Sequence, residues 1–410
     1  MAVSSIVSMI QELFKQCILY VCTLMNQIKL WIGHLFGYEL VEKEVKHSKV
    51  LPEKKNQKPK EKKEKVPKLT NRVAASNTKT WNSKHELVYS VIKGQIGDCT
   101  SCSFSNNGKH IAIASEDHTI RIYSLKTIND NPPKYLRVVI EGDFADKIGF
   151  SEDDKYLVCA LNSTHKINVY SVSSEGITLF TQFDIDRYGS INTFDVCGSG
   201  ALTYVTYTCL IKDPYIRIYS ISGNLLSKYN PSQIENYHGN LGIYSNKRYF
   251  GLGTFSCDVS IYQLVMTKSL EFTKFTKLFA LKGTKTGVLD IDISPAGFAA
   301  FITKDNHLFV YNLNVKYDIH EEPNLLADYN FSEIKPTRIF VYPTSRSCIL
   351  LNYKNVYIVD LRTGNIINTI ENASVGEIID IHIHPQAKVF SVNTNNDKSV
   401  RLFKLPEIEE

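Results

Sequence analysis

The sequence predicts an all-β protein, a seven-bladed β-propeller that follows an apolar helical segment and a lysine-rich linker. Three observations support this prediction: one short phrase recurs seven times, turn signals separate the apolar runs between the copies, and the lone strand at the start of the repeated region matches an outer strand missing at its end. Strands and turns that recur roughly every 40–50 residues are typical of propeller blades.

The repeated phrase first closes the stretch SEDHTIRIYSL. Six echoes follow it along the chain: KINVYSV, YIRIYSI, DVSIYQL, HLFVYNL, NVYIVDL and SVRLFKL. Each unit between them reads as three strands: an alternating run such as CTSCSFS, an apolar run such as HIAIAS, and the echo itself, with Gly- or Asp-rich turns between. Intervening pieces such as YLRVVIE, ITLFTQFD and KLFALKG supply a fourth, outer strand. Residues 85–410 are therefore predicted to form seven blades.

The two ends of this region predict how the ring closes. Only PEIEE follows the seventh echo, so the seventh unit has no outer strand of its own. HELVYSVI, at the start of the region, is a strand without inner partners before it. Pairing residues 86–92 with 399–405 satisfies both and removes an open sheet edge.

The first segment, residues 1–41, is predicted to be an apolar helix that anchors the protein to a membrane. Its apolar residues recur at spacings of three and four and form one stripe: Ile10, Phe14, Cys17, Val21, Leu24, Ile28, Trp31 and Leu35. Lys15 and Lys29 bracket thirteen uncharged residues, short of the roughly 20 that a spanning helix needs. The helix can therefore cross the bilayer with snorkelling lysines, lie in the interface, or pack on the protein's own domain.

The second segment, residues 42–84, is predicted to be a disordered linker, because it is rich in lysine and proline and poor in apolar residues. It holds fourteen basic and five acidic side chains. Its densest run contains seven lysines: Lys54, Lys55, Lys58, Lys60, Lys62, Lys63 and Lys65. Lysines directly after an apolar anchor favour the cytosolic side and attract anionic lipid. A solvated spacer, a nuclear-import signal and RNA contact are the alternatives for this run.

The remaining residues hold 31 basic and 35 acidic side chains, so the large domain is mildly acidic. This balance argues against a basic nucleic-acid groove across the propeller. The nine cysteines are odd in number and scattered, which indicates a reducing compartment. Cys99 and Cys102 form a C-x-x-C without a second pair, which is typical of buried thiols.

The stretch FSNNGKHIAIASEDHTIRIYSL resembles the WD-repeat propellers, because Ser115, Asp117, Thr119 and Arg121 fit their turn-and-strand signature. FSCDVSIYQL, FALKG, VKYDIHEEP and KSVRLF extend the resemblance to a membrane-anchored member with the same three-part layout. The resemblance implies a propeller on the cytosolic face of the endoplasmic reticulum membrane. It also implies association with the stress-responsive kinase that phosphorylates translation initiation factor 2, and with the translation machinery.

The chain also departs from the family pattern. Tyr-Ser replaces the Trp-Asp that names the repeat in the first three units, and Thr284 stands where the Gly-His motif has histidine. These changes are expected to weaken the His–Ser–Asp–Trp hydrogen-bond network and to leave blade packing to aromatic and aliphatic contacts.

No reaction-bearing motif stands out: there is no G-x-S-x-G, no H-E-x-x-H and no phosphate-cradling glycine loop. Asp380, His382 and His384 share one strand face, but strand spacing keeps them about 6–7 Å apart, so a metal site is not expected. Asp290 and Asp292 are interpreted as core or channel-lining residues. Asp117, Asp305 and Asp397 precede echoed strands and are predicted to cap their own turns. No catalytic residue, cofactor or metal is predicted.

The sequence therefore predicts a non-enzymatic, membrane-anchored scaffold whose partners are other proteins. The alternative is a nuclear or nucleolar scaffold that uses the lysine run for import or RNA contact. A lumenal or secreted hydrolase is a third hypothesis, in which the sequons at Asn162, Asn330 and Asn372 would carry glycans.

Overall fold

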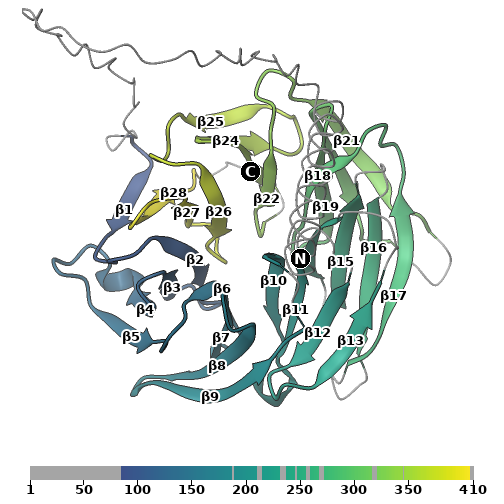
Figure 1. The fold of residues 1–410 in the computed structure, drawn as a ribbon. Helices are drawn as coiled ribbons and strands as arrows, with labels where there is room; N and C mark the ends of the chain where they lie inside the picture. Colours follow the sequence, from purple (N-terminus) through teal and green to yellow (C-terminus); the bar gives the residue numbers. More distant parts are fainter. Residues whose placement is uncertain are drawn as a thin grey trace, which may run out of the picture. The chain divides into compact units, whose positions relative to one another are not determined.

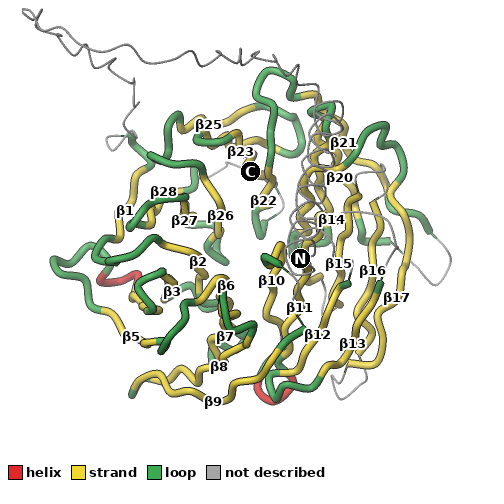
Figure 2. The backbone as a smooth tube through the Cα atoms, in the orientation of Figure 1, coloured by secondary structure: helices red, strands yellow, loops and turns green. Residues whose placement is uncertain are grey.

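The computed structural model describes residues 85–406, except 187–188, 210–214, 231–236, 245–246, 255–258, 267–271, 316–320 and 345. The described chain folds into seven four-stranded antiparallel sheets, arranged as consecutive sectors of a ring (Figure 1). Apart from two short 3-10 turns, the described elements are strands (Figure 2). The seven-bladed propeller predicted from the sequence is confirmed.

Blades 1 to 3 follow one another along the chain. Blade 1 consists of β2 (Cys99–Phe104), β3 (His110–Ser115), β4 (Thr119–Ser124) and β5 (Tyr135–Val139), with the 3-10 turn η1 (Leu125–Thr127). Blade 2 consists of β6 (Ala145–Phe150), β7 (Tyr156–Leu161), β8 (Lys166–Ser173) and β9 (Gly176–Asp184). Blade 3 consists of β10 (Ile191–Cys197), η2 (Gly200–Leu202), β11 (Tyr204–Cys209), β12 (Ile216–Ser220) and β13 (Leu225–Tyr229).

Blades 4 to 6 repeat the same order. Blade 4 consists of β14 (Tyr237–Tyr244), β15 (Lys247–Thr254), β16 (Val259–Met266) and β17 (Phe272–Leu281). Blade 5 consists of β18 (Val288–Ile293), β19 (Phe298–Thr303), β20 (His307–Asn312) and β21 (Asn324–Asn330). Blade 6 consists of β22 (Arg338–Val341), β23 (Ser347–Asn352), β24 (Asn355–Asp360) and β25 (Ile366–Ile370).

Blade 7 joins the two ends of the ring. It consists of β26 (Ile378–Ile383), β27 (Val389–Thr394), β28 (Val400–Lys404) and, as its outer strand, β1 (Val88–Ile92). β1 pairs antiparallel with β28, so that Val91 lies opposite Arg401 and Ile92 opposite Val400. The pairing predicted for 86–92 and 399–405 is thus found within slightly narrower bounds, and β28 has a paired strand on each side.

Burial follows position within each blade. The second and third strands are almost wholly buried, as in β3 and β4, because each lies between two neighbouring sheets. Outer strands such as β5 and β21 are mostly exposed. Apolar runs without alternation therefore mark the second strands, since both of their faces pack.

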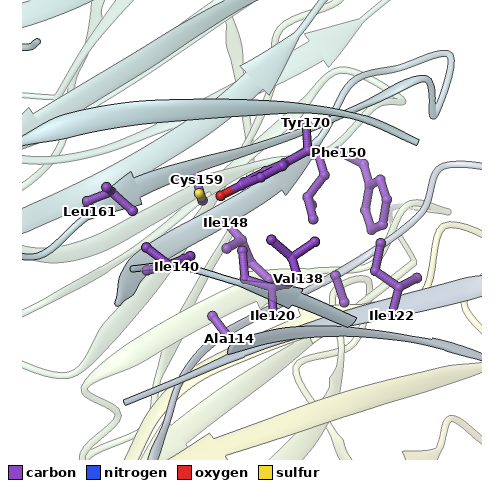
Figure 3. Packing of buried hydrophobic residues seen from close by; sticks show 13 residues of the cluster. Ala114, Ile120, Ile122, Val138, Ile140, Ile148, Phe150, Cys159, Leu161 and Tyr170 are labelled. Carbon is purple, nitrogen blue, oxygen red and sulfur yellow. The ribbon is translucent and has the colours of Figure 1, made fainter. Parts of the chain in front are cut away.

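The hydrophobic core is divided into clusters between adjacent sheets. Figure 3 shows the cluster between blades 1 and 2, in which Ile120 and Val138 of one sheet face Ile148 of the next. Small residues let the sheets approach near the axis: a Cβ on Gly149 would lie 2.7 Å from the Val196 side chain. Truncating a buried Ile or Leu of such a cluster to Ala costs about 2–5 kcal/mol.

Candidate functional site

The turns between second and third strands and the connections between blades lie on the same side of the ring, called the connection face here. Neighbouring strands run in opposite directions. The second strand of each blade therefore ends on the same side of the ring as the outer strand of the blade before it. Hydrogen bonds fix the turns to the connections: Glu116 N–H donates to Asp98 O at 2.9 Å, and Asn395 N–H to Glu377 O at 3.0 Å. The connection face is therefore a set of braced loops.

Two of the predicted turn aspartates, Asp117 and Asp397, each pair with an arginine four residues later. Asp117 Oδ1 accepts from Thr119 N–H at 3.1 Å, while Oδ2 accepts from Ile96 N–H at 3.0 Å and Arg121 Nη2 at 2.9 Å. Burial alone would raise the pKa of Asp117, but the hydrogen bonds from Thr119 and Ile96 and the Arg121 charge outweigh it and lower that pKa. These contacts are those of a turn cap that also holds an arginine.

Asp397 repeats this arrangement in blade 7. Its Oδ1 accepts from Ser399 N–H at 2.9 Å and Ser399 Oγ at 2.8 Å, and its Oδ2 lies 2.6 Å from Arg401 Nη2. Both partners of this ion pair are nearly buried, with 3% of the Arg401 side chain exposed. Blades 1 and 7 thus each pair the aspartate of the turn with a buried arginine of the third strand.

Asp305 of blade 5 has different partners. Its Oδ1 accepts from Thr303 Oγ1 at 2.6 Å and Thr286 Oγ1 at 2.7 Å. Phe309 occupies the position that Arg121 has in blade 1, so no arginine of the third strand pairs with this carboxylate. Asp305 therefore joins its turn to the preceding connection through threonine hydroxyls.

Buried arginines are a feature that the sequence reasoning missed. Arg121, Arg217 and Arg401 occupy the same position in three echoes and are 4%, 0% and 3% exposed. Arg217 Nη2 lies 3.3 Å from Asp186 Oδ2, and Lys228 Nζ lies 2.6 Å from the same oxygen. The recurrence of arginine in TIRIYS, YIRIYS and SVRLFK is the signal that could have identified them.

Tyrosine hydroxyls replace part of the missing family network. Tyr311, at the position of the usual tryptophan, donates its hydroxyl to Lys282 O in the connection before blade 5. Tyr207 donates to Asp186 O at 2.8 Å, and Tyr329 to Arg362 O at 2.6 Å. The expectation that only aromatic and aliphatic contacts remain is therefore wrong, because these rings also form directed hydrogen bonds.

The central channel forms a polar cavity of about 400 Å³, lined by inner-strand residues of blades 1, 2, 3, 5, 6 and 7. Asp290 Oδ2 accepts from Ile339 N–H at 3.0 Å and Arg338 Nε at 3.2 Å. Asp292 Oδ2 accepts from Val341 N–H at 2.6 Å. The two predicted channel-lining aspartates of blade 5 thus bind the inner strand of blade 6.

Other charges continue these contacts around the channel. Arg338 Nη1 donates to Ile379 O at 2.8 Å, joining blade 6 to blade 7. Asp380 Oδ2 lies 3.3 Å from His382 Nε2 and 3.8 Å from Lys147 Nζ of blade 2. Because these carboxylates and cations serve one another, the polar lining acts chiefly as a structural brace.

The pKa values of two channel carboxylates, Asp292 and Asp380, are shifted in opposite directions. Burial raises the pKa of Asp292 to about 6, and the neighbouring Asp290 charge adds to the effect. Burial opposes ionisation of Asp380 as well, but the charges of His382 and Lys147 outweigh it and hold the pKa of Asp380 far below its usual range. The first side chain is thus costly to ionise, whereas the second is stabilised as an anion.

Asp380, His382 and His384 share a strand face but have different partners: Asp380 pairs with His382, whereas His384 contacts blade 1. His384 Nε2 contacts Gly108 O at 2.9 Å, and its ring packs edge-on against Phe104 of blade 1. Within the described residues, no group of three or more His, Cys, Asp or Glu side chains is placed to hold a metal. These residues therefore act as contacts between blades.

The cysteines of the C-x-x-C are buried in blade 1. Burial raises the pKa of Cys99 well above its usual range and that of Cys102 to about 12. Cys102 Sγ lies 3.1 Å from Ser391 Oγ of blade 7. Thiols held in the protonated form are poor nucleophiles, so this pair packs between blades.

The predicted anchor, Ile10 to Leu35, and the predicted lysine-rich linker lie outside the described residues. Across the part of the chain that the structure describes, no helix has the length and apolar character to span a membrane. Both segments remain predictions.

Comparisons with known proteins confirm the resemblance to WD-repeat proteins. A family model described as "WD domain, G-beta repeat" matches residues 86–124. The mouse protein "Transducin beta-like protein 2" is 25% identical over 330 residues, covering 78% of this chain and 73% of that protein. The human protein of the same name is 24% identical, covering 72% of this chain and 66% of that protein, just under two thirds of its length.

A solved structure matches the fold. The β-propeller domain of Cps50 (Swd1) from Myceliophteria thermophila has a TM-score of 0.58 and 11% sequence identity, covering 78% of this chain and 99% of that domain. This likeness concerns the fold alone. A WD-type propeller is typically a scaffold that binds other proteins.

Proposed function

We propose that this WD-repeat-like propeller is a scaffold that holds partner proteins at the cytosolic face of the endoplasmic reticulum membrane. The observation that carries the proposal is the order of the parts. A seven-bladed ring of braced loops follows a sequence with an apolar stripe and a lysine run. A ring of this kind offers rigid faces to partners, and tethering raises their effective concentration near the membrane.

The stress-signalling part of the proposal rests on resemblance. The resemblance stated from the sequence implies association with the stress-responsive kinase that phosphorylates translation initiation factor 2, and with the translation machinery, and the two relatives at about 25% identity support the resemblance itself. The described residues support a binding role more than a catalytic one. The charged side chains of the channel pair with one another, and the free thiols are buried. A binding role uses the loops of such a ring without requiring a reactive group.

Carbonate extraction combined with glycosidase treatment tests the anchor and its sidedness. The full chain should stay in the membrane pellet and should not change mass with endoglycosidase, although Asn330 is exposed and could accept a glycan in the lumen. Release into the supernatant would remove the anchor from the proposal. A glycosidase-sensitive mass shift would reverse the topology and favour the lumenal alternative.

The nuclear alternative draws on the fourteen basic residues of 42–84. Imaging a fluorescent fusion of residues 1–84 separates the two hypotheses. A reticular signal supports the membrane scaffold. A nuclear or nucleolar signal supports an import function for the lysine run, and would replace the proposal made here.

A further inference from the structure

We propose that three exposed apolar side chains on the connection face, Tyr353, Val375 and Ile96, form a docking surface for a basic, apolar segment of a partner protein. We call this surface the apolar arc. The inference rests on the proposed scaffold function and deepens it, because it assigns a place on the ring and a partner chemistry.

The arc runs across three consecutive sectors, blades 6, 7 and 1 (Figure 1). Tyr353 lies in the turn between β23 and β24, Val375 in the connection between blades 6 and 7, and Ile96 in the connection between blades 7 and 1. The turn between β27 and β28 links the Val375 connection to the Ile96 connection, since the carbonyl of Asp397 in this turn accepts from Cys99 N–H at 2.9 Å. The arc is therefore one continuous strip of neighbouring loops.

Hydrogen bonds hold this strip in one arrangement. Tyr353 O accepts from Ile378 N–H at 3.0 Å, and Lys354 O accepts from Ala373 N–H at 2.9 Å. Lys354 Nζ donates to Val375 O at 2.5 Å. At the other end, Ile96 N–H donates to Asp117 at 3.0 Å. A surface that is already ordered loses little conformational entropy when a partner binds.

The exposure of these side chains is unusual for their position. Ile96 is 76% exposed, Tyr353 66% and Val375 53%. The other large apolar side chains that the described residues expose all lie on outer strands, from Tyr135 in β5 to Ile367 in β25. The large apolar side chains that the described loops expose thus all lie on three consecutive sectors of the ring, and exposed apolar surface rimmed by polar residues marks interaction sites.

Tyr353 also adopts a costly backbone conformation. Its φ is +52°, in the left-handed region that Gly, Asn and Asp tolerate best. The turns between second and third strands in blades 1, 2, 5 and 7 place His118, His165, Asn306 and Asn396 at such angles. Blade 6 alone among these described turns uses a large phenol there, and exposes it. A residue that folding disfavours at an exposed turn points to a role in binding.

Charge around the arc indicates the partner's chemistry. The exposed carboxylates of Glu371 and Glu377 flank Val375 along the chain, and Glu116 is exposed beside the Ile96 loop. Lys354 donates to Val375 O but keeps its charge, so the ammonium groups of these loops are those of Lys93, Lys354 and Lys398, and the half-buried Asp98 adds a fourth carboxylate. An excess of carboxylates beside apolar side chains suits a segment with apolar residues on one side and lysine or arginine on the other.

Binding of designed peptides to the full chain tests the inference. The probe is an 18-residue fluorescent helical peptide of leucine and lysine, and its counterpart carries glutamate in place of lysine. Fluorescence anisotropy at physiological ionic strength should show saturable binding of the lysine peptide and none of the glutamate peptide. Tyr353→Asn should weaken the lysine peptide at least tenfold, while the melting temperature stays equal or rises, since Asn fits a positive φ.

Matched variants give the outcomes that decide the matter. Val375→Asp should weaken binding as Tyr353→Asn does, whereas Leu325→Asp, at a residue 48% exposed on outer strand β21, should leave it unchanged. Equal binding by Tyr353→Asn, equal binding of the glutamate peptide, or an equal loss in Leu325→Asp would overturn the inference. If Val375→Asp does not fold, Tyr353→Asn still decides. A chain that binds the lysine peptide but leaves the membrane in carbonate would keep this inference and lose the proposed anchoring.

Discussion

Blades 1 and 5 carry an aspartate in the same turn but surround it with different chemistry. In blade 1, Asp117 holds Arg121, and both side chains are 5% exposed. In blade 5, Asp305 accepts only threonine hydroxyls within its turn and connection, while Phe309 fills the arginine position and stacks on Phe301 at 5.2 Å between centroids. The same turn residue thus forms a buried ion pair in one blade and hydrogen bonds with neutral hydroxyls in the other.

The two blades also differ at the channel. Blade 5 projects Asp290 and Asp292 toward blade 6, whereas blade 1 has the neutral Ser101 at the position of Asp290, and its hydroxyl accepts from Ile148 N–H of blade 2 at 3.3 Å. The ion pair of blade 1 thus lies at the turn, between Asp117 and Arg121, whereas that of blade 5 lies at the axis, between Asp290 and Arg338 of blade 6. The blades therefore share a backbone arrangement, but the side-chain ion pairs and hydrogen bonds that hold neighbouring blades together differ from blade to blade.

The largest effect is expected from Asp117→Ala. The change leaves the Arg121 cation buried without its carboxylate, which costs about 3–5 kcal/mol in the free energy of unfolding. Denaturant unfolding measures it. The double variant Asp117→Ala/Arg121→Leu should recover part of the loss, and a cost below about 1 kcal/mol for the single change would remove the contrast between the blades.

The pH dependence of Asp292→Asn tests the axis of blade 5. Because the folded-state pKa of Asp292 is about 6, above the ordinary 3.8, its contribution to stability falls as pH rises from about 4 to 6. The total loss is up to about 3 kcal/mol. Thermal midpoints across this window should lose that downward slope in Asp292→Asn.

Asp380→Asn supplies the opposite control. Its depressed pKa means that its stabilisation is lost as pH falls, so the variant should flatten the acid limb of the profile. Identical profiles for the wild type and Asp292→Asn would contradict the assignment of a raised pKa to that side chain.

Asp305→Ala should cost less than Asp117→Ala. It removes two hydroxyl hydrogen bonds and strands no buried cation, so the expected loss is about 1–2 kcal/mol. The two variants, unfolded under the same conditions, compare the blades directly. Equal losses would mean that the turn geometry, and not the partner, sets the energy.

Tyr311→Phe should have the smallest effect, about 1 kcal/mol, because it removes one hydrogen bond to Lys282 O and keeps the ring stack on Phe301. Tyr135→Phe, at a residue 47% exposed, is the matched control and should be neutral. If Tyr311→Phe leaves the free energy of unfolding unchanged, the hydrogen bond to Lys282 O does not stabilise blade 5 and only ring packing remains.

The sequence predicted the fold well because a propeller repeats its signals. Echoed strands at even spacing gave the number of blades, and the leftover strand at 85–92 gave the closure. The turn positions of Asp117, Asp305 and Asp397 were also visible as residues that precede echoes.

The contacts between blades could not be read in the same way. Asp290 meets Arg338 and Asp380 meets Lys147 only because the ring brings distant inner strands to one axis. Tyr353 looks like an ordinary turn residue in the sequence, and its positive φ and exposure emerge only in three dimensions. The repeated sequence pattern predicts the backbone of each blade. The side-chain partners of neighbouring blades, in contrast, are known only once the ring has brought their strands together.

Hydrogen exchange of β28 tests the closed ring most directly. In the full chain, Lys404 N–H donates to Leu87 O at 2.7 Å, and β28 is flanked by β27 and β1. The amides of Val400–Lys404 should exchange as slowly as those of β24, the equivalent strand of a blade formed by continuous chain. Rapid exchange of every second amide in β28, as at an exposed sheet edge, would contradict the closure.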